Sequence, residues 1–103
     1  RRDAESVEQF HKNRMKFQPK DEKFVEKVRE NFAAQTVMRF IGAKLTRIEA
    51  GEIEIELPYR KDLTQQNGYL HAGIITTIAD SAGGYAAFSL MPKGAEVLSV
   101  EFK

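Results

Sequence analysis

The sequence predicts an α+β domain in which one long, nearly uncharged helix packs against antiparallel strands. Residues 71–90 are rich in Ala and Gly and contain a single charged side chain, Asp80, so this helix is expected to be buried on almost all sides. Residues 52–57 instead alternate Glu with Ile or Leu. That period of two is typical of a strand with one buried and one solvated face, and it puts the three glutamates on the solvent side.

The first 35 residues are expected to form a helical segment of their own. Val7, Phe10 and Arg14 share helical spacing, and Pro19 ends that helix. A second amphipathic helix follows, with Asp21 as its expected cap. Its apolar positions recur with a period near 3.6 and are Phe24, Val25, Val28 and Phe32. The two helices would cover one edge of a domain that spans residues 36–103.

A β-hairpin is expected after a short apolar stretch over residues 37–41 that ends at Gly42. Its elements are a strand over residues 44–48, a tight turn at residues 50–51 and a strand over residues 52–57. Pro58 ends the second strand because it cannot donate a hydrogen bond to the ladder. The polar residues 59–69 should then form a loop that leads into the long helix.

The long helix should pack closely against another backbone and end before a third strand. Gly83 and Gly84 lie in mid-helix, where each costs about 1 kcal/mol relative to Ala, so close approach of a sheet or a second helix is the expected gain. Pro92 and Gly94 end the helix, and residues 97–102 read as a strand. Three short strands cannot cover an apolar helix on all sides. We therefore expect further C-terminal strands, a partner chain, or both to complete the core.

Composition excludes several classes of function. The 103 residues suit one domain, and 16 basic against 15 acidic residues give no broad attraction for nucleic acid. The sequence has no cysteine, which rules out disulfides, thiol nucleophiles and Cys-based metal sites and fits a cytoplasmic location. No apolar run approaches the length of a membrane span, and no secretory signal is evident. Because the chain begins at Arg1, we expect that its natural N-terminus was processed, trimmed or left out.

The junction between the polar loop and the long helix is a candidate active site. If the helix begins near His71, the N–H groups of Ala72 and Gly73 lack partners within the helix and could bind the oxygen of an acyl group. Asp80 lies about 12 Å further along the axis, at 1.5 Å per residue. It cannot reach a carbonyl held at the start of its own helix. It could reach one held by an antiparallel second copy, so the site should be shared between two subunits.

The same residues carry a resemblance to a known family. Gln65, Gly68, the run His71-Ala72-Gly73 and the acid nine residues after the histidine resemble the loop and central helix of the hotdog-fold acyl-CoA thioesterases. The closest group is the phenylacetate-degradation, or PaaI-like, type. Residues 99–102 also resemble the segment that follows the family's helix, so the match covers residues 42–103. The resemblance implies a hotdog fold, a long central helix wrapped by an antiparallel sheet, whose C-terminal strands are apparently missing from this chain.

The resemblance also implies a function, the hydrolysis of an acyl-CoA thioester to the free acid and CoA by a homodimer or homotetramer. Asp80 would be the nucleophile or general base, Gln65 would orient the thioester or the water, and the Ala72 N–H would polarise the carbonyl. Ser99 would help to position a water. The other candidates would bind substrate or brace the loop, and they are His71, Gly73, Asn67 and Gly68. Coenzyme A is then part of the substrate, and no metal or other cofactor is implied.

One residue departs from the family pattern. The first glycine that usually follows the histidine is Ala72 here. The expected chemistry uses only the backbone N–H of this residue. Alanine can therefore serve if its φ is negative, as it is at a helix start.

Two other functions and several structural interpretations stay open at this point. A hotdog hydratase or dehydratase would pair a histidine with an acid, but His71 and Asp80 lie about 13 Å apart along one helix. A non-catalytic acyl-CoA-binding module would keep the fold without needing Asp80. His71 could equally be a helix cap, and Asp80 could be paired to Arg or Lys. Gln65 and Asn67 could serve solely to form the turn of the loop. Arg60 and Lys61 could meet the CoA phosphates or could be solvated charge.

Overall fold

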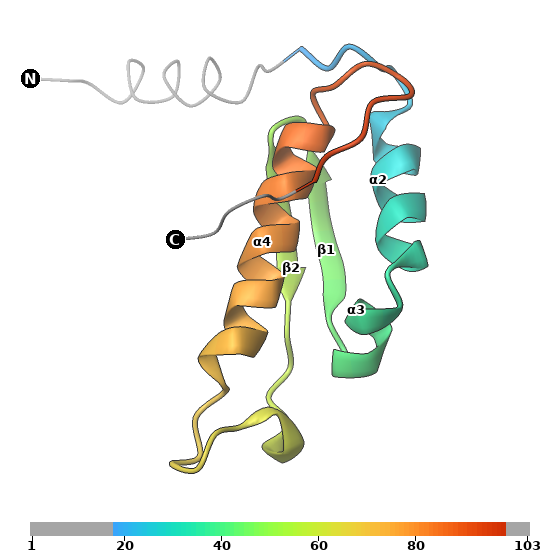
Figure 1. Cartoon of the computed structure of the whole chain (residues 1–103). Coiled ribbons are helices and arrows are strands. Elements are labelled where there is room, and N and C mark those ends of the chain that lie inside the picture. Colours follow the sequence, from blue (N-terminus) through green and yellow to red (C-terminus); the bar gives the residue numbers. More distant parts are fainter. Residues whose placement is uncertain (1–17, 99–103) are drawn as a thin grey trace, which may run out of the picture.

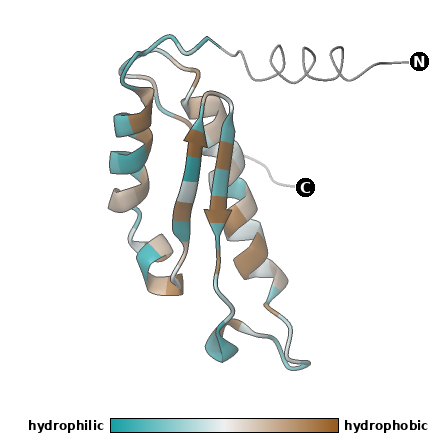
Figure 2. Ribbon diagram, turned by 180° about the vertical axis from the view of Figure 1, so that it is seen from behind, coloured by the Kyte–Doolittle hydropathy of each residue, from teal (hydrophilic) through white to brown (hydrophobic). Residues whose placement is uncertain are grey.

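The computed structural model describes residues 18–98, in which two helices lie over one face of a β-hairpin. The elements are α2 (Phe24–Ala34), α3 (Thr36–Ile41), β1 (Lys44–Glu49), β2 (Glu52–Glu56), the 3₁₀ turn η1 (Lys61–Leu63) and α4 (Ala72–Phe88). Figures 1 and 2 show α2 packed beside β1 and α4 beside β2, so the described part has two layers. This arrangement confirms the predicted α+β class. The first predicted helix and residues 99–102, with Ser99, lie outside the described residues.

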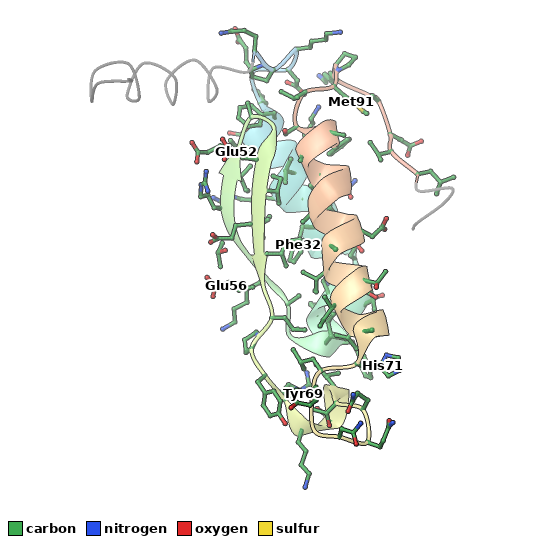
Figure 3. The ribbon with its side chains drawn as sticks, turned by 90° about the vertical axis from the view of Figure 1, so that its left-hand side faces the viewer. Phe32, Glu52, Glu56, Tyr69, His71 and Met91 are labelled. Carbon is green, nitrogen blue, oxygen red and sulfur yellow. The ribbon has the colours of Figure 1, made fainter. Side chains whose placement is uncertain are left out.

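The predicted hairpin is confirmed, with each strand boundary within one residue of the expectation. β1 and β2 pair antiparallel through a turn at residues 50–51, where Gly51 has a φ of 77°, a region that other residues rarely adopt. Figure 3 shows Glu52 and Glu56 on the side of the hairpin that faces away from α4. Ile55, which alternates with these glutamates, packs on the core instead. The glutamates therefore form a solvent face, as the alternation predicted.

The helix start near Asp21 differs from the prediction. The residue that caps α2 is Lys23, and its side chain makes no capping hydrogen bond. Asp21 instead accepts a hydrogen bond from the Lys23 N–H through Oδ1 at 2.9 Å, which closes a turn ahead of the helix. The apolar stretch that follows α2 forms the short helix α3, and Gly42 ends it in the left-handed conformation with a φ of 80°.

The core lies under α3 and ties this helix to the loop that precedes α4. Its buried residues are Met38, Ile41, Ala43 and Leu63. Partly buried side chains of the other elements surround this cluster and include Phe32, Ile55, Ile74 and Ile78. Figure 3 shows Phe32 between the hairpin and α4. The loop that carries the candidate site is thus fixed to the fold through Leu63.

The far end of α4 is anchored by two polar contacts. Ser89 is fully buried, and its Oγ accepts a hydrogen bond from the Gly51 N–H at 2.8 Å, which links the helix end to the hairpin turn. Lys27 of α2 donates to the Met91 carbonyl at 2.8 Å, and its Nζ lies 4.7 Å from the centre of the Phe88 ring. The end of α4 is therefore held by both the hairpin and α2.

Truncating the central core side chain should destabilise the fold strongly. Met38 is 1% exposed, so Met38→Ala is expected to lower the free energy of unfolding by about 2–5 kcal/mol, because it removes buried methylenes and leaves a cavity. Denaturant unfolding measures this loss. Phe40→Ala is the matched control on the same helix, because Phe40 is 77% exposed, and it should change stability by less than about 0.5 kcal/mol. Equal effects of the two variants would show that the core is not under α3.

The prediction that the long helix is buried on almost all sides is wrong for the described chain. Within α4 only Tyr85 is buried, and Ile75 is 52% exposed. The hairpin and α2 cover one side of α4, and no described strand covers the other. Val97 and Leu98, which were expected to begin a third strand, lie outside any regular element. The helix therefore presents an apolar, small-residue surface to whatever completes the fold.

Candidate functional site

The start of α4 is capped by His71. Its Nδ1 accepts a hydrogen bond from the Gly73 N–H at 2.8 Å, so the neutral ring carries its proton on Nε2. A Cβ at position 73 would lie 3.1 Å from that Nδ1, which explains why glycine fits here. The expectation that Ala72 and Gly73 both offer open N–H groups is therefore half wrong. Ala72 alone, as the first residue of the helix, has an N–H without a partner inside the helix.

The capping role of His71 can be tested by measuring the stability of variants at this position. His71→Ala removes the acceptor and should lower the free energy of unfolding by about 0.5–2 kcal/mol, the range for loss of an N-terminal cap. His71→Asn should retain most of the stability, because asparagine is among the best capping residues. Thermal unfolding of the two variants against the unchanged chain measures both values. An alanine variant as stable as the unchanged chain would contradict the capping role.

The loop before α4 is a tight turn built by its own polar groups. Thr64 and Leu70 pair as an isolated bridge, and the Gln65 N–H donates to the Tyr69 carbonyl at 2.8 Å. The Gln65 side-chain oxygen accepts a hydrogen bond from the Asn67 N–H, so the oxygen is committed to the turn. The amide nitrogen of this side chain can donate but cannot accept.

Gly68 and Asn67 shape this turn. Gly68 has a φ of 87°, and its carbonyl accepts a hydrogen bond from the Tyr59 hydroxyl at 3.1 Å. Asn67 is exposed, and its backbone N–H donates the hydrogen bond to the Gln65 side-chain oxygen. Both residues are thus structural elements of the loop. Figure 3 shows Tyr69 in this loop and His71 at the adjoining helix start.

Asp80 lies in the middle of α4, away from the loop. It lies eight positions after Ala72, about 12 Å along the axis. The Asp80 side chain is half-buried. Asp80 also has an interaction partner. The structure thus places His71, Ala72 and Gly73 at the helix start and Gln65 in the loop before it, and it keeps Asp80 eight positions further along α4 in the same chain.

Asp80 opens onto a groove that the sequence did not predict. The groove has a volume of about 290 Å³ and runs between α2, α4 and residues 96–98. Besides Asp80, its polar lining includes Asn31, Gln35, Ser81 and Tyr85. The one sequence feature that could have indicated this groove is Tyr85, a single Tyr within an Ala- and Gly-rich helix. Asp80 therefore lines this groove and does not lie at the start of α4.

The Arg60 side chain makes hydrogen bonds to other residues of the fold. It donates to the Asp62 carboxylate through two nitrogens at 2.8 and 3.0 Å, and to the Phe40 carbonyl at 3.0 Å. These hydrogen bonds hold the pKa of the Asp62 carboxyl below its usual value. A role toward CoA phosphates would require breaking that pairing. Lys61 is exposed beside it.

The described residues place limits on other kinds of site. Among residues 18–98, no three His, Asp or Glu side chains gather in a way that could hold a metal ion. In the same range no helix combines the length and the apolar character needed to cross a bilayer.

Comparison with known proteins points to the thioesterases. The crystal structure of a thioesterase family protein from Silicibacter pomeroyi matches with a TM-score of 0.76 and 54% sequence identity, over 78% of this chain and 59% of that chain. The proofreading thioesterase EntH of Klebsiella pneumoniae is 32% identical over 66 residues, which are 64% of this chain and 48% of that protein. A provisionally named esterase of Saccharolobus solfataricus is 35% identical over 57 residues, 55% of this chain and 41% of that protein. No protein-family model matches the sequence.

These similarities confirm the predicted relationship to the thioesterases and the predicted fold. The chain spans about half the length of the curated relatives it matches. The PaaI-like subtype and the division into residues 1–35 and 36–103 stay predictions.

Proposed function

We propose that this chain hydrolyses an acyl-CoA thioester to the free acid and CoA, at a site shared between two copies of the chain. The observation that carries the proposal is the separation of the two candidate halves along α4. An N–H without a helical partner lies at Ala72, and the carboxylate of Asp80 lies about 12 Å further along, in a groove. One helix cannot bring these groups to the same carbonyl. Two antiparallel copies of the helix can.

The proposed mechanism uses donors from one copy and the acid from the other. The Ala72 N–H binds the thioester oxygen at the positive end of the helix dipole, where the negative charge of a tetrahedral intermediate is stabilised. The amide nitrogen of Gln65 donates toward the same substrate group, because its oxygen is held in the turn. Asp80 of the second copy takes a proton from the attacking water as the C–O bond forms. The C–S bond then breaks, the proton held by Asp80 passes to the leaving sulfur, and CoA leaves as the thiol.

The remaining candidates support this site. His71 acts through its cap, which fixes the orientation of the first helical turn. Ser99 is proposed to position the water, on the resemblance alone. The proposal needs no metal or redox cofactor, and the expected assembly is a homodimer or a homotetramer in the cytoplasm.

The separation of His71 from Asp80 argues against a hydratase dyad within one chain. That chemistry needs a histidine free to exchange a proton with the substrate beside an acid. Here Nδ1 accepts the Gly73 N–H, and Asp80 lies more than two helical turns away in the same chain. A dyad within one chain is therefore excluded by the helix itself.

A thiol-release assay over a panel of aryl and alkyl acyl-CoA thioesters tests the proposed function. The expected result is stoichiometric release of CoA thiol by a species that sediments as a dimer or larger. Loss of enoyl absorbance without thiol release would identify a hydratase instead. Binding of the acyl-CoA without either signal would identify a non-catalytic module. A stable monomer with full activity would contradict the shared site.

A further inference from the structure

The hydrogen bond that caps α4 depends on the protonation state of one ring. His71 Nδ1 can accept the Gly73 N–H, at 2.8 Å, only while this nitrogen carries no hydrogen. A proton added to the neutral imidazole goes to Nδ1, because Nε2 already carries one. The acceptor then becomes a donor that faces another donor, and the added charge lies at the positive end of the helix dipole. Protonation of His71 therefore breaks the cap.

The His71 ring can leave the cap without disturbing the core. The residue is exposed, and Figure 3 shows its ring on the side of the helix start that faces away from the hairpin. The backbone of His71 is held separately. Its N–H donates to the Leu63 carbonyl at 2.9 Å, and its carbonyl accepts a hydrogen bond from the Ile74 N–H at 3.0 Å. The change is thus confined to the side chain and the first turn of α4.

The cap also restrains the Ala72 N–H, which has no partner inside the helix. The hydrogen bond from the Gly73 N–H to the His71 ring closes a loop of covalent bonds that includes the peptide between His71 and Ala72. This closure limits the rotation of that peptide and so fixes the direction of the Ala72 N–H. When the cap opens, the Gly73 N–H is released and the peptide gains freedom. The proton therefore acts on the group to which we assign oxyanion binding.

His71 is the group at the start of α4 whose charge ordinarily changes near neutral pH. The other charged or titratable side chains on η1, on the loop of residues 64–70 and on α4 are Lys61, Asp62, Tyr69, Asp80 and Tyr85. Asp62 is paired with Arg60, and Asp80 lies nine positions along α4, about 13 Å from His71. Among these types of side chain, imidazole is the one that ordinarily titrates between about pH 5 and 8.

We propose that His71 is a pH-sensitive switch of the start of α4. With a neutral ring, the first turn is closed and the Ala72 N–H has one direction. With a protonated ring, the turn is open and the Gly73 N–H is released to solvent. The stability that the cap contributes is therefore present while the ring is neutral and is lost as the pH falls through its titration. The effect on turnover rests on the proposed thioesterase function, whereas the switch itself does not.

Nuclear magnetic resonance of the unchanged chain tests the switch without any variant. The amide signal of Gly73 should titrate together with the ring signals of His71 between about pH 8 and 5, because one proton controls both. The ring nitrogen signals at the upper pH should be those of the form with its hydrogen on Nε2. The amide of Gly83, in the middle of α4, is the control and should not follow the ring. A Gly73 signal that does not follow the ring would overturn the inference.

Two variants distinguish the switch from a cap that is only structural. At about pH 8, His71→Ala should raise the unfolding equilibrium constant by about 2- to 30-fold, the usual value of a cap, and at about pH 5 it should leave this constant unchanged. His71→Asn keeps a cap that does not titrate, so its stability relative to His71→Ala should be the same at both pH values. An equal cost of His71→Ala at both pH values would overturn the inference.

A ratio of rates extends the test to turnover. Both the unchanged protein and His71→Asn contain Asp80, so the titration of this acid cancels when their kcat values are divided. The ratio of the unchanged protein to the variant should fall as the pH is lowered from about 8 to 5. A constant ratio beside a titrating Gly73 signal would contradict the role of the Ala72 N–H in hydrolysis and sustain the switch. Absence of thiol release from both proteins would contradict the proposed function, and the resonance and unfolding results would still decide the switch.

Discussion

Replacing Asp80 with Asn is expected to lower kcat for acyl-CoA hydrolysis by about 10²–10⁴-fold, the usual contribution of a general base. The amide has nearly the same shape but cannot take the proton of the attacking water. Because Asp80 is only half-buried, the substitution should leave the fold and the oligomer intact, which circular dichroism and sedimentation would check. The rate is measured by thiol release at saturating substrate.

The control for this variant is another Asp→Asn change. Asp62 is an exposed acid paired with Arg60 on η1, and Asp62→Asn should change kcat by less than about twofold, because exposed ion pairs contribute little. Undiminished turnover in Asp80→Asn would remove the acid from the mechanism.

The second large effect is expected from Ala72→Pro, which deletes a single backbone N–H. Proline suits the first position of a helix, and the residue before a proline must be extended, which His71 already is, with φ −61° and ψ 135°. The helix should therefore form as before while its proposed oxyanion donor is absent. The expected loss is about 10²–10³-fold in kcat, the value of one oxyanion-hole donor.

Two comparisons make the Ala72→Pro result decisive. Ala72→Ser keeps the N–H and should retain kcat within about threefold, since it removes no donor. The melting temperature of Ala72→Pro should match that of the unchanged chain, because the lost N–H has no partner within the helix. A fully active proline variant would show that this N–H does not bind the reacting oxygen.

Much of the fold could be predicted because it depends on patterns of residues that are close together in the sequence. The alternation of residues 52–57 fixed the hairpin and its solvent face, and Gly51 marked the turn. The long helix was predicted to within two residues of its observed ends. The expected burial of that helix failed for a physical reason. Burial depends on what covers a surface, and the described hairpin and α2 cover only one side of α4.

The candidate site was predictable in its spacing but not in its hydrogen bonding. The nine residues from His71 to Asp80 set their separation through the rise of a helix. The hydrogen bond from the Gly73 N–H to the His71 ring could not be predicted from the sequence, because a side-chain cap depends on the rotamer of the capping residue. The hydrogen bond from Gln35 to Tyr85 in the groove beside Asp80 was missed because these two residues lie 50 positions apart in the chain.

The central claim is that one copy supplies the helix start and another supplies the acid, and mixing two inactive variants tests it most directly. Asp80→Asn lacks the acid and Ala72→Pro lacks the donor, so neither should turn over thioester alone. After the two proteins are mixed in equal amounts and their subunits exchanged, half of the dimers should be mixed. Each mixed dimer restores one intact site of two, so the account predicts about a quarter of the normal activity in the thiol-release assay. Activity that stays at the level of the separate variants after verified exchange would contradict a shared site.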